Sequence, residues 1–365
     1  MTQRTARHEV SGDLSSTSLS VPLRHPAQAY AAAPAEHALV PIAVPEVVLG
    51  RGEVLVAVEL ATLCEVDLAS LSAGLTSPPP RLIGHEQVGR VVAYGPGERP
   101  VTSDGLPLTL GDRIVWSRRV RCGRCAECEA AAASALSVHC LAPDVYGHSP
   151  ARRGWELSGG VASHVHLRAH TVIVRARDWV PPTVLALASC ATAAAAAAVE
   201  AVGDVGPGSR VFVAGCDAAG LTAIAMLRER GATVVAVDSR GPRRAWAEEF
   251  GARLAQHPDE AAAGADALIE FTETASVPPR WGADPATASR VVRVASHAPP
   301  CAAETHAPTR TGGEARHLRA GVAFLERADH ALFARLVERV IPLGAVTDAT
   351  SVTPLSGLRV GVRPG

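Results

Sequence analysis

Residues Arg210–Val237 read RVFVAGCDAAGLTAIAMLRERGATVVAV. Apolar runs predict buried strands at Arg210–Ala214 and Thr233–Val237, and the residues between them predict a helix at Leu221–Arg230. Glycines before the helix favour a tight turn whose backbone N–H groups can face an anion. The pattern is typical of a β-α-β unit in a doubly wound parallel sheet, so we expect an α/β protein.

Further elements are expected on both sides of this unit. Upstream, an alanine-rich helical run follows Pro181 and ends at Val202, and before it β-branched runs alternate with Pro and Gly. That half therefore predicts a loop-rich β domain, with strands in Ala38–Leu60, Val88–Val92, Arg113–Trp116 and Val172–Val174. Downstream, the expected elements are helices at Pro242–Phe250 and Leu332–Val340, strands at Ala267–Phe271, Arg290–Ala295 and Arg359–Val362, and a loop at Ala298–Gly313.

The chain is expected to contain two domains and an N-terminal extension. A length of 365 residues allows two domains of roughly 100–200 residues each. Residues 1–36 are rich in Ser, Thr, Pro and Ala without a period, so we expect them to be loosely ordered. Residues 37–182, completed by 335–365, are expected to form the β-rich domain, and residues 183–334 the doubly wound domain.

The charge balance argues against strongly charged partners. The chain has 35 Lys+Arg and 36 Asp+Glu, so no overall field attracts nucleic acid or an anionic membrane. All of the basic residues are arginine, and the lack of lysine excludes P-loop NTPases, protein kinases and pyridoxal-phosphate enzymes. We expect a small-molecule substrate, and neither nucleic acid nor a membrane as partner.

The sequence also favours a cytoplasmic location. Residues 1–36 have no apolar core of signal-peptide type, and the mildly apolar run Val184–Val199 is too short for a bilayer span. Eight cysteines are too few in this length for a secreted disulfide scaffold.

Four of the cysteines form a cluster in the sequence. Two residues separate Cys122 from Cys125 and Cys125 from Cys128, and Cys140 follows after eleven more. Two-residue gaps let a loop bring sulfur atoms within coordination distance of one Zn²⁺ ion. Because four protein ligands leave no open position, the cluster predicts a structural zinc. The alternative is four buried cysteines without a metal.

Three further residues form a possible second zinc site. Cys64, His85 and Cys190 could supply two thiolates and an imidazole, and a water would complete the open tetrahedral site of a catalytic zinc. Each residue is a weak signal, because a histidine beside a strand is usually a core residue and a single cysteine is usually a small buried apolar one.

The order of these motifs resembles that of the zinc-dependent medium-chain alcohol dehydrogenases. The resemblance covers Val40–Arg363 and rests on Cys64, Gly84-His85-Glu86, the cysteine cluster, Gly159–His164, Cys190 and the glycine-rich β-α-β unit. A narrower resemblance, to a bacterial subgroup named for phosphonate metabolism, rests on Tyr146-Gly147-His148, Gly154–Gly160 and the tail Arg359–Pro364.

The family resemblance implies a GroES-like catalytic domain followed by a Rossmann domain. It implies a catalytic zinc on Cys64, His85 and Cys190 and a structural zinc on the four-cysteine cluster, hence two zinc ions per chain. It further implies that Asp67 orients His85 and that Glu86 lies beside the metal. A homodimer or homotetramer is implied as well.

The dinucleotide fingerprint G-x-G-x-x-G is altered in this chain. Gly215 and Gly220 match its first and last glycines, but Asp217 stands at the middle position and adds a side chain and a negative charge. Asp238, at the end of the second strand, is in the place of a ribose-binding carboxylate and favours NAD over NADP, although Arg240 weakens that preference. An ordinary polar residue closing a strand is the alternative for Asp238. Arg359 matches a family arginine near the pyrophosphate.

Other departures from the family lie near the expected metal site. Val66 and Ala69 stand where the family commonly has the residues of a proton relay. Glu65 replaces a Gly, His or Arg, so Glu65 and Asp217 are expected to oppose the same pyrophosphate.

The leading expectation is an alcohol dehydrogenase-like oxidoreductase that transfers hydride between a small alcohol and NAD(P). One alternative is a zinc Lewis-acid lyase or hydratase without a redox cofactor, in which the cofactor site is degraded at Asp217 and Glu65. In that case Glu86 and Asp67 become candidate acid/base groups. A silent scaffold that retains structural zinc is a third possibility.

Overall fold

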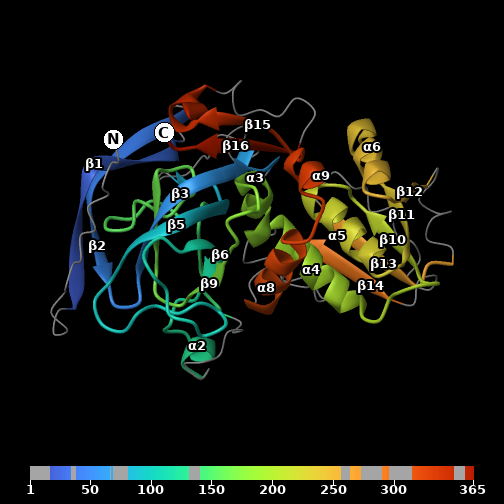
Figure 1. Ribbon diagram of the computed structural model, residues 1–365, viewed down its shortest axis with the longest axis horizontal. Coiled ribbons are helices and arrows are strands. Elements are labelled where there is room, and N and C mark those ends of the chain that lie inside the picture. Colours follow the sequence, from blue (N-terminus) through green and yellow to red (C-terminus); the bar gives the residue numbers. More distant parts are fainter. Residues whose placement is uncertain are drawn as a thin grey trace.

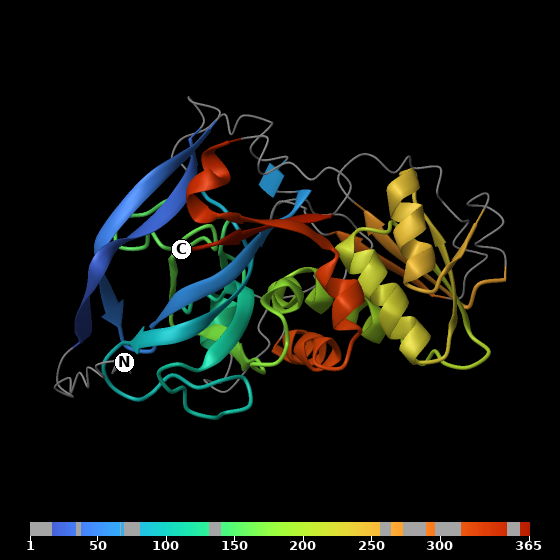
Figure 2. The same cartoon turned by 45° about the horizontal axis from the view of Figure 1, so that its top comes forward.

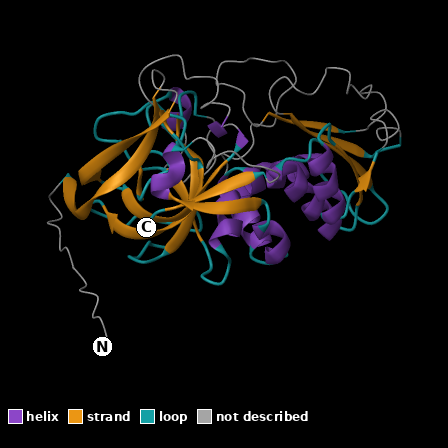
Figure 3. Ribbon diagram, turned by 90° about the horizontal axis from the view of Figure 1, so that it is seen from above, coloured by secondary structure: helices purple, strands orange, loops and turns teal. Residues whose placement is uncertain are grey.

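The computed structural model describes residues 17–33, 38–65, 67–68, 81–130, 140–255, 264–272, 290–295, 315–348 and 358–365. Strands dominate one lobe, which carries the C-terminus, and helices flank a parallel sheet in the other (Figure 1). Seen from above, the helices lie between the two groups of strands (Figure 3). The arrangement is the expected α/β architecture with a β-rich part and a doubly wound part.

The β-rich lobe is built on an eight-stranded sheet. Its path is β15-β16-β3-β5-β6-β7, with β8 paired to β3 and β9 paired to β6. The strands are β3 (Val54–Leu63), β5 (Glu86–Tyr94), β6 (Arg113–Val120), β7 (Asp144–Val145), β8 (His164–Leu167), β9 (Thr171–Arg175), β15 (Val337–Pro342) and β16 (Arg359–Arg363). Trp116, Tyr146 and Trp155 fill the core behind the sheet. The sheet places the ends of β3 and β5 side by side, because Thr62 pairs with Glu86.

A long hairpin precedes this sheet and corrects one expectation. β1 (Ser18–Ala33) pairs with β2 (Ala38–Gly50) and with the short β4 (Arg81–Leu82). The expected loose order of residues 1–36 is therefore wrong for β1. Ala27, Ala29 and Ala31 are buried at every second position. Alanine has little intrinsic strand preference, so only the pairing with β2 reveals the strand.

The other lobe contains a five-stranded parallel sheet in the order β12-β11-β10-β13-β14. The strands are β10 (Arg210–Ala214), β11 (Thr233–Val237), β12 (Arg253–Leu254), β13 (Ala267–Thr272) and β14 (Val291–Ala295), and the helices beside them are α4 (Ala191–Val202), α5 (Ala218–Glu229) and α6 (Gly241–Glu249). After β10 the chain first adds β11 and β12 on one side of β10 and then β13 and β14 on the other side. In open α/β sheets, ligands bind where the strand order reverses in this way, outside the carboxyl ends of the strands.

The alanine-rich run is divided into three pieces rather than forming one helix. α3 (Pro182–Leu185) and the 3-10 turn η1 (Ala186–Ser189) precede α4, and Cys190 lies between η1 and α4 with φ −122° and ψ −77°. η1 contacts β5 and β6 of the other lobe. Cys190 therefore lies where the two lobes meet. The two lobes lie side by side, with the C-terminus in the strand-rich one (Figure 2).

The C-terminal region differs from the sequence-based expectation. The helix expected at Leu332–Val340 is wrong beyond its first turn, because α9 (His330–Ala334) ends early and Val337–Pro342 is strand β15. β15 pairs in parallel with β16, which supplies the hydrogen bonds that a helix would have made internally. α8 (Ala315–Leu325) was not expected. The loop expected at Ala298–Gly313 lies outside the described residues.

Two short helical segments complete the described elements. α2 (Ala126–Ala130) lies inside the cysteine loop, and η3 (Leu343–Thr347) follows β15. Within the described ranges, no single helix is long and apolar enough to cross a membrane. Only Pro182–Ser189 and Ala191–Val202 taken together, at a bend of 55°, reach that length and composition.

Candidate metal centres and cofactor site

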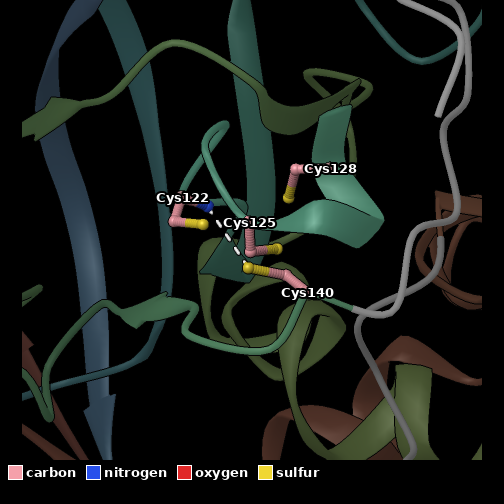
Figure 4. A group of neighbouring side chains, drawn as sticks. All are labelled: Cys122, Cys125, Cys128 and Cys140. Carbon is pink, nitrogen blue, oxygen red and sulfur yellow. Dashed lines mark hydrogen bonds between the residues drawn. The ribbon is translucent and has the colours of Figure 1, made fainter. Parts of the chain in front are cut away.

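The four clustered cysteines come together in space. Their sulfur atoms all lie within 4.8 Å of one another, and all four thiols are unpaired and partly exposed (Figure 4). The Cys122 backbone N–H donates to Cys140 Sγ at 3.3 Å. Backbone N–H groups of Leu141 and Cys128 lower the pKa of Cys125 to about 6, which favours a thiolate. Tetrahedral Zn–S bonds of 2.3 Å separate sulfur atoms by roughly 3.8 Å, so four thiols gathered this closely fit a zinc ion.

A second group of ligand-type side chains is buried between the lobes. Cys64 follows β3, His85 precedes β5 and Cys190 directly precedes α4. The His85 Nε2 atom lies 3.7 Å from Cys64 Sγ, and His85 also shares a possible metal-binding group with Cys190. Zn–S and Zn–N bonds at a tetrahedral angle separate sulfur from nitrogen by roughly 3.6 Å. The chemistry of these side chains and the spacing of Cys64 and His85 therefore fit a zinc ion.

Asp67 fixes the orientation of His85. Its Oδ1 atom lies 3.4 Å from His85 Nδ1, while its Oδ2 atom accepts a hydrogen bond from the Cys64 backbone N–H at 3.0 Å. Burial opposes ionisation of Asp67, but His85 outweighs it and lowers the pKa of the carboxyl. An N–H on Nδ1 that points to this carboxylate leaves Nε2 free to bind a metal.

The two candidate thiols differ in their electrostatic surroundings. Burial and the charge of Asp67 raise the pKa of Cys64 to about 11. Burial also opposes ionisation of Cys190, but Arg118 and His85 lower its pKa below the ordinary value.

Glu86 is fully buried and held by several partners. The Arg359 guanidinium donates to it from Nε at 2.7 Å and from Nη2 at 3.2 Å, and Thr62 Oγ1 donates at 2.7 Å. Burial would raise the pKa of Glu86, but Arg359 lowers it. The Ala191 backbone N–H also donates to Glu86, at 3.3 Å, which ties the start of α4 to β5. Glu86 therefore lies beside the buried group as a paired carboxylate.

The glycine turn after β10 keeps two of its glycines for steric reasons. Gly215 has φ +89°, and a Cβ there would lie 2.3 Å from the Phe271 carbonyl oxygen. A Cβ at Gly220 would lie 2.0 Å from the Gly215 carbonyl oxygen. Asp217 has φ −72°, which any L residue adopts, and its Oδ1 accepts a hydrogen bond from the Gly220 N–H at 2.8 Å. Asp217 thus caps α5, and burial raises its pKa.

Arg359 connects this turn with the buried metal-type group. Besides its pairing with Glu86, it is close enough to Asp217 for its charge to lower the pKa of that carboxyl against the effect of burial. Arg359 itself is buried.

Asp238 ends β11 with both carboxylate oxygens engaged. Oδ2 accepts from the Cys216 N–H and Oδ1 from the Arg240 N–H, each at 2.8 Å. Glu65 is paired with the side chains of Arg240 and Arg243. The expectation that Glu65 opposes a pyrophosphate is therefore corrected, because these two arginines compensate its charge. Val66 and Ala69, the positions of the missing proton relay, lie outside the described residues.

Two residues that the sequence did not single out as site residues adjoin the buried group. Arg118 Nη1 lies 3.5 Å from Cys190 Sγ, and the ring of His148 packs against that of His85 with centroids 4.6 Å apart. Burial lowers the pKa of His148 to about 4, and the charge of His85 adds to this effect. The sequence carries no signal for either role, because Arg118 is one of 35 basic residues and the importance of both depends on tertiary neighbours.

Comparison with known proteins agrees with this geometry. Residues 50–178 match the model of the alcohol dehydrogenase GroES-like domain. Over 211 residues the chain is 31% identical to a probable alcohol dehydrogenase of Mycobacterium tuberculosis, which covers 57% of this chain and 56% of the relative. Over 206 residues it is 29% identical to the 5-exo-hydroxycamphor dehydrogenase of Pseudomonas putida, covering 55% and 54%. The chain thus spans about half the length of the curated relatives it matches.

Solved structures show the same fold over nearly the whole chain. An alcohol dehydrogenase from Thermotoga maritima superposes with a TM-score of 0.73 at 24% identity, covering 95% of this chain and 100% of that one. A putative zinc-binding dehydrogenase from Sinorhizobium meliloti, bound to NADP, superposes with a TM-score of 0.70 at 22% identity, covering 93% and 100%. The curated relatives named above are dehydrogenases, which does not favour the lyase or hydratase alternative. Residues 50–178 therefore match the alcohol dehydrogenase GroES-like domain, and the chain as a whole shares the fold of these dehydrogenase structures.

Proposed function

We propose that this protein is a zinc-dependent oxidoreductase that transfers hydride between a small alcohol and its aldehyde or ketone, with a nicotinamide dinucleotide as cofactor. The observation that carries the proposal is the 3.7 Å separation of Cys64 Sγ and His85 Nε2, with Cys190 also within 4.8 Å of a ligand atom of His85. These ligand types at this spacing are those of a catalytic zinc with an open position.

In this proposal Cys64, His85 and Cys190 hold the catalytic metal, which would act as a Lewis acid on an alcohol or carbonyl oxygen. Asp67 keeps the His85 ring in one tautomer and orientation, because it accepts a hydrogen bond from the Nδ1–H. Glu86 and Arg359 compensate each other's charge at the boundary of the site. Their pairing links β5 to β16 across the strand β3 that lies between them.

The four thiols of the cysteine cluster would hold a second, structural zinc, which gives two zinc ions per chain. Free thiols throughout the described part of the chain also support a cytoplasmic location. We further propose a homodimer or homotetramer, which light scattering of the purified protein would test.

The dinucleotide would lie across the carboxyl ends of β10 and β11. Gly215 and Gly220 would let the backbone approach its pyrophosphate, Asp238 would face the adenosine ribose, and Arg359 would contribute positive charge. A carboxylate at the ribose position supports NAD over NADP. The bound nicotinamide would accept or donate the hydride.

Metal analysis combined with cofactor titration tests the proposal. The purified chain should hold close to two zinc ions and should bind NAD, as followed by nicotinamide fluorescence. His85→Ala and Cys190→Ala should each lose one zinc ion and all alcohol-dependent NAD reduction. His330→Ala, a substitution on α9, should retain two zinc ions and the NAD reduction. Two zinc ions without binding of NAD or NADP would refute the dehydrogenase and support the zinc lyase or hydratase instead.

A further inference from the structure

The Arg118 side chain occupies an unusual position beside the candidate catalytic metal ligands. It extends from β6, and its Nη1 atom lies 3.5 Å from Cys190 Sγ. Among the residues that the structure describes, Arg118 forms no ion pair with a carboxylate. A guanidinium carries five N–H donors in a planar fork, so one contact with a sulfur atom leaves most of its donors available.

The carboxylates around the site already have other partners. Asp67 lies against His85, Glu86 pairs with Arg359, and Glu65 pairs with Arg240 and Arg243. Two cysteine thiolates would balance the double charge of a zinc ion. Within the described part of the site, none of these carboxylates forms an ion pair with Arg118.

His148 adds a second polar side chain on the same side. Its ring packs against His85 at a centroid distance of 4.6 Å and is close enough to Arg118 to feel its charge. The backbone joins the two residues, because the Tyr146 N–H donates to the Arg118 carbonyl oxygen at 2.9 Å. Arg118 and His148 therefore border the metal ligands from one connected pair of segments, β6 and the turn after β7.

We propose that Arg118, with His148 beside it, binds an anionic group of the substrate. The substrates would then be small alcohols or carbonyl compounds that carry a carboxylate or a phosphate-type oxyanion a few bonds from the reacting carbon. A guanidinium binds both oxyanions through two parallel hydrogen bonds. The turnover of such substrates rests on the proposed dehydrogenase function, whereas the binding of their anionic group to Arg118 does not.

The test compares charged and neutral alcohols of similar shape. The probes are 3-hydroxypropionate, 2-hydroxyethylphosphonate and the neutral 3-hydroxypropionamide, each assayed with zinc-loaded protein and either NAD or NADP. The wild-type protein should prefer at least one anionic probe over the amide in kcat/KM. Arg118→Gln should lower that preference by roughly 10- to 150-fold, the usual range for a lost hydrogen bond to a charged group, while Arg118→Lys should lower it less. The phosphonate and the carboxylate identify which oxyanion the site takes.

A binding measurement makes the test independent of turnover. Calorimetric titration of the zinc-loaded protein with the two anionic probes should show binding that Arg118→Gln weakens by a similar factor and that added salt weakens further. Arg152→Gln is the matched control, because Arg152 is an exposed arginine paired with Asp144. Its loss should change neither the kcat/KM preference for anionic probes nor the affinity for them.

The outcomes distinguish a failure of the proposed dehydrogenase function from a failure of anion binding by Arg118. If no alcohol, charged or neutral, reduces NAD(P), the proposed function fails while the calorimetric experiment still decides the role of Arg118. If wild-type protein and Arg118→Gln bind the anions equally, or if the wild type shows no preference for an anion, the proposal is overturned. If Arg118→Gln only lowers zinc content and keeps the same preference at full zinc loading, Arg118 is a positioning residue for Cys190 and the proposal is likewise overturned.

Discussion

The Asp217 carboxylate accepts a hydrogen bond from the Gly220 backbone N–H at 2.8 Å and so caps helix α5. Asp217 stands where the dinucleotide fingerprint has its middle glycine. The N–H groups at this helix terminus are the donors that a pyrophosphate would use. The carboxylate therefore competes with the cofactor for the same backbone group and adds a like charge beside it.

Replacing Asp217 with Gly should tighten NAD binding. The substitution removes both the charge and the Cβ, and we expect a gain of about 1–3 kcal/mol, a factor of roughly 5 to 150 in dissociation constant. Titration of nicotinamide fluorescence at low and high salt measures this gain, which should shrink as salt rises. Asp217→Asn keeps a capping oxygen without the charge, so it should give part of the gain. Low-micromolar NAD binding by the parent, unchanged in Asp217→Gly, would contradict this account.

The cap itself contributes little to the outcome of that experiment. Exchanging a capping aspartate for glycine costs only a few tenths of a kcal/mol, whereas alanine costs about 1 kcal/mol. Asp217→Ala should therefore lower stability more than Asp217→Gly, which urea denaturation of the two variants compares directly.

Removing one thiol of the cysteine cluster should release one of two zinc ions. Cys125→Ser takes away the ligand whose pKa the backbone lowers to about 6. Because a structural zinc contributes directly to folding, the melting temperature should fall by about 5 °C or more. Metal analysis and calorimetry measure both effects, and Glu127→Gln, an exposed change in the same loop, is the control. A parent chain with a single zinc ion contradicts the assignment of two sites.

The sequence predicts the parallel sheet better than the rest of the fold. β10 and β11 begin and end at the predicted residues, because strands buried on both faces are continuous apolar runs that local sequence reveals. β15 could not be found in this way. Leu332, Leu336 and Val340 recur at helical spacing, and only the distant pairing with β16 makes the second half of that segment a strand.

The candidate sites also differ in how well the local sequence predicts them. The spacing of the four cysteines is a local signal, so the cluster in space follows from the sequence. Cys64, His85 and Cys190 are brought together by β3, β5 and α4, and only the resemblance to a family linked them beforehand. Arg118 could not be predicted, because its importance lies in a contact with a residue 72 positions away.

The buried pair of Glu86 and Arg359 gives a prediction about stability. Arg359→Leu leaves the fully buried Glu86 without its cation, and breaking a buried pair from one side costs about 3–5 kcal/mol. Urea denaturation should show this loss. The exposed pair of Arg335 and Glu249 has a similar distance of 2.6 Å, yet Glu249→Gln should cost less than about 1 kcal/mol. Equal losses in the two variants would mean that burial does not determine the cost.

Glu53 should make the free energy of unfolding depend on pH under acidic conditions. It precedes β3, its Oε2 lies 2.8 Å from His166 Nε2, and its Oε1 accepts from Arg168 at 2.9 Å. The Gly50 backbone N–H donates to Oε2 at 2.7 Å. Burial raises the pKa of Glu53, but these partners outweigh burial and lower it from 4.5 to about 2.

Because the pKa of Glu53 is lower in the folded than in the unfolded chain, its contribution is complete above the unfolded value of 4.5 and is lost as the pH falls toward about 2. At about pH 6 the parent should be more stable than Glu53→Gln by about 2 kcal/mol, a figure reduced from the full shift because solvent partly screens the group. Urea denaturation from about pH 6 to about pH 3 should show this gap narrowing below about pH 4.5. For Glu249→Gln the gap to the parent should stay small throughout the range, because its carboxylate is exposed. A gap for Glu53→Gln that stays constant down to about pH 3 would mean that the carboxylate is not the group that titrates.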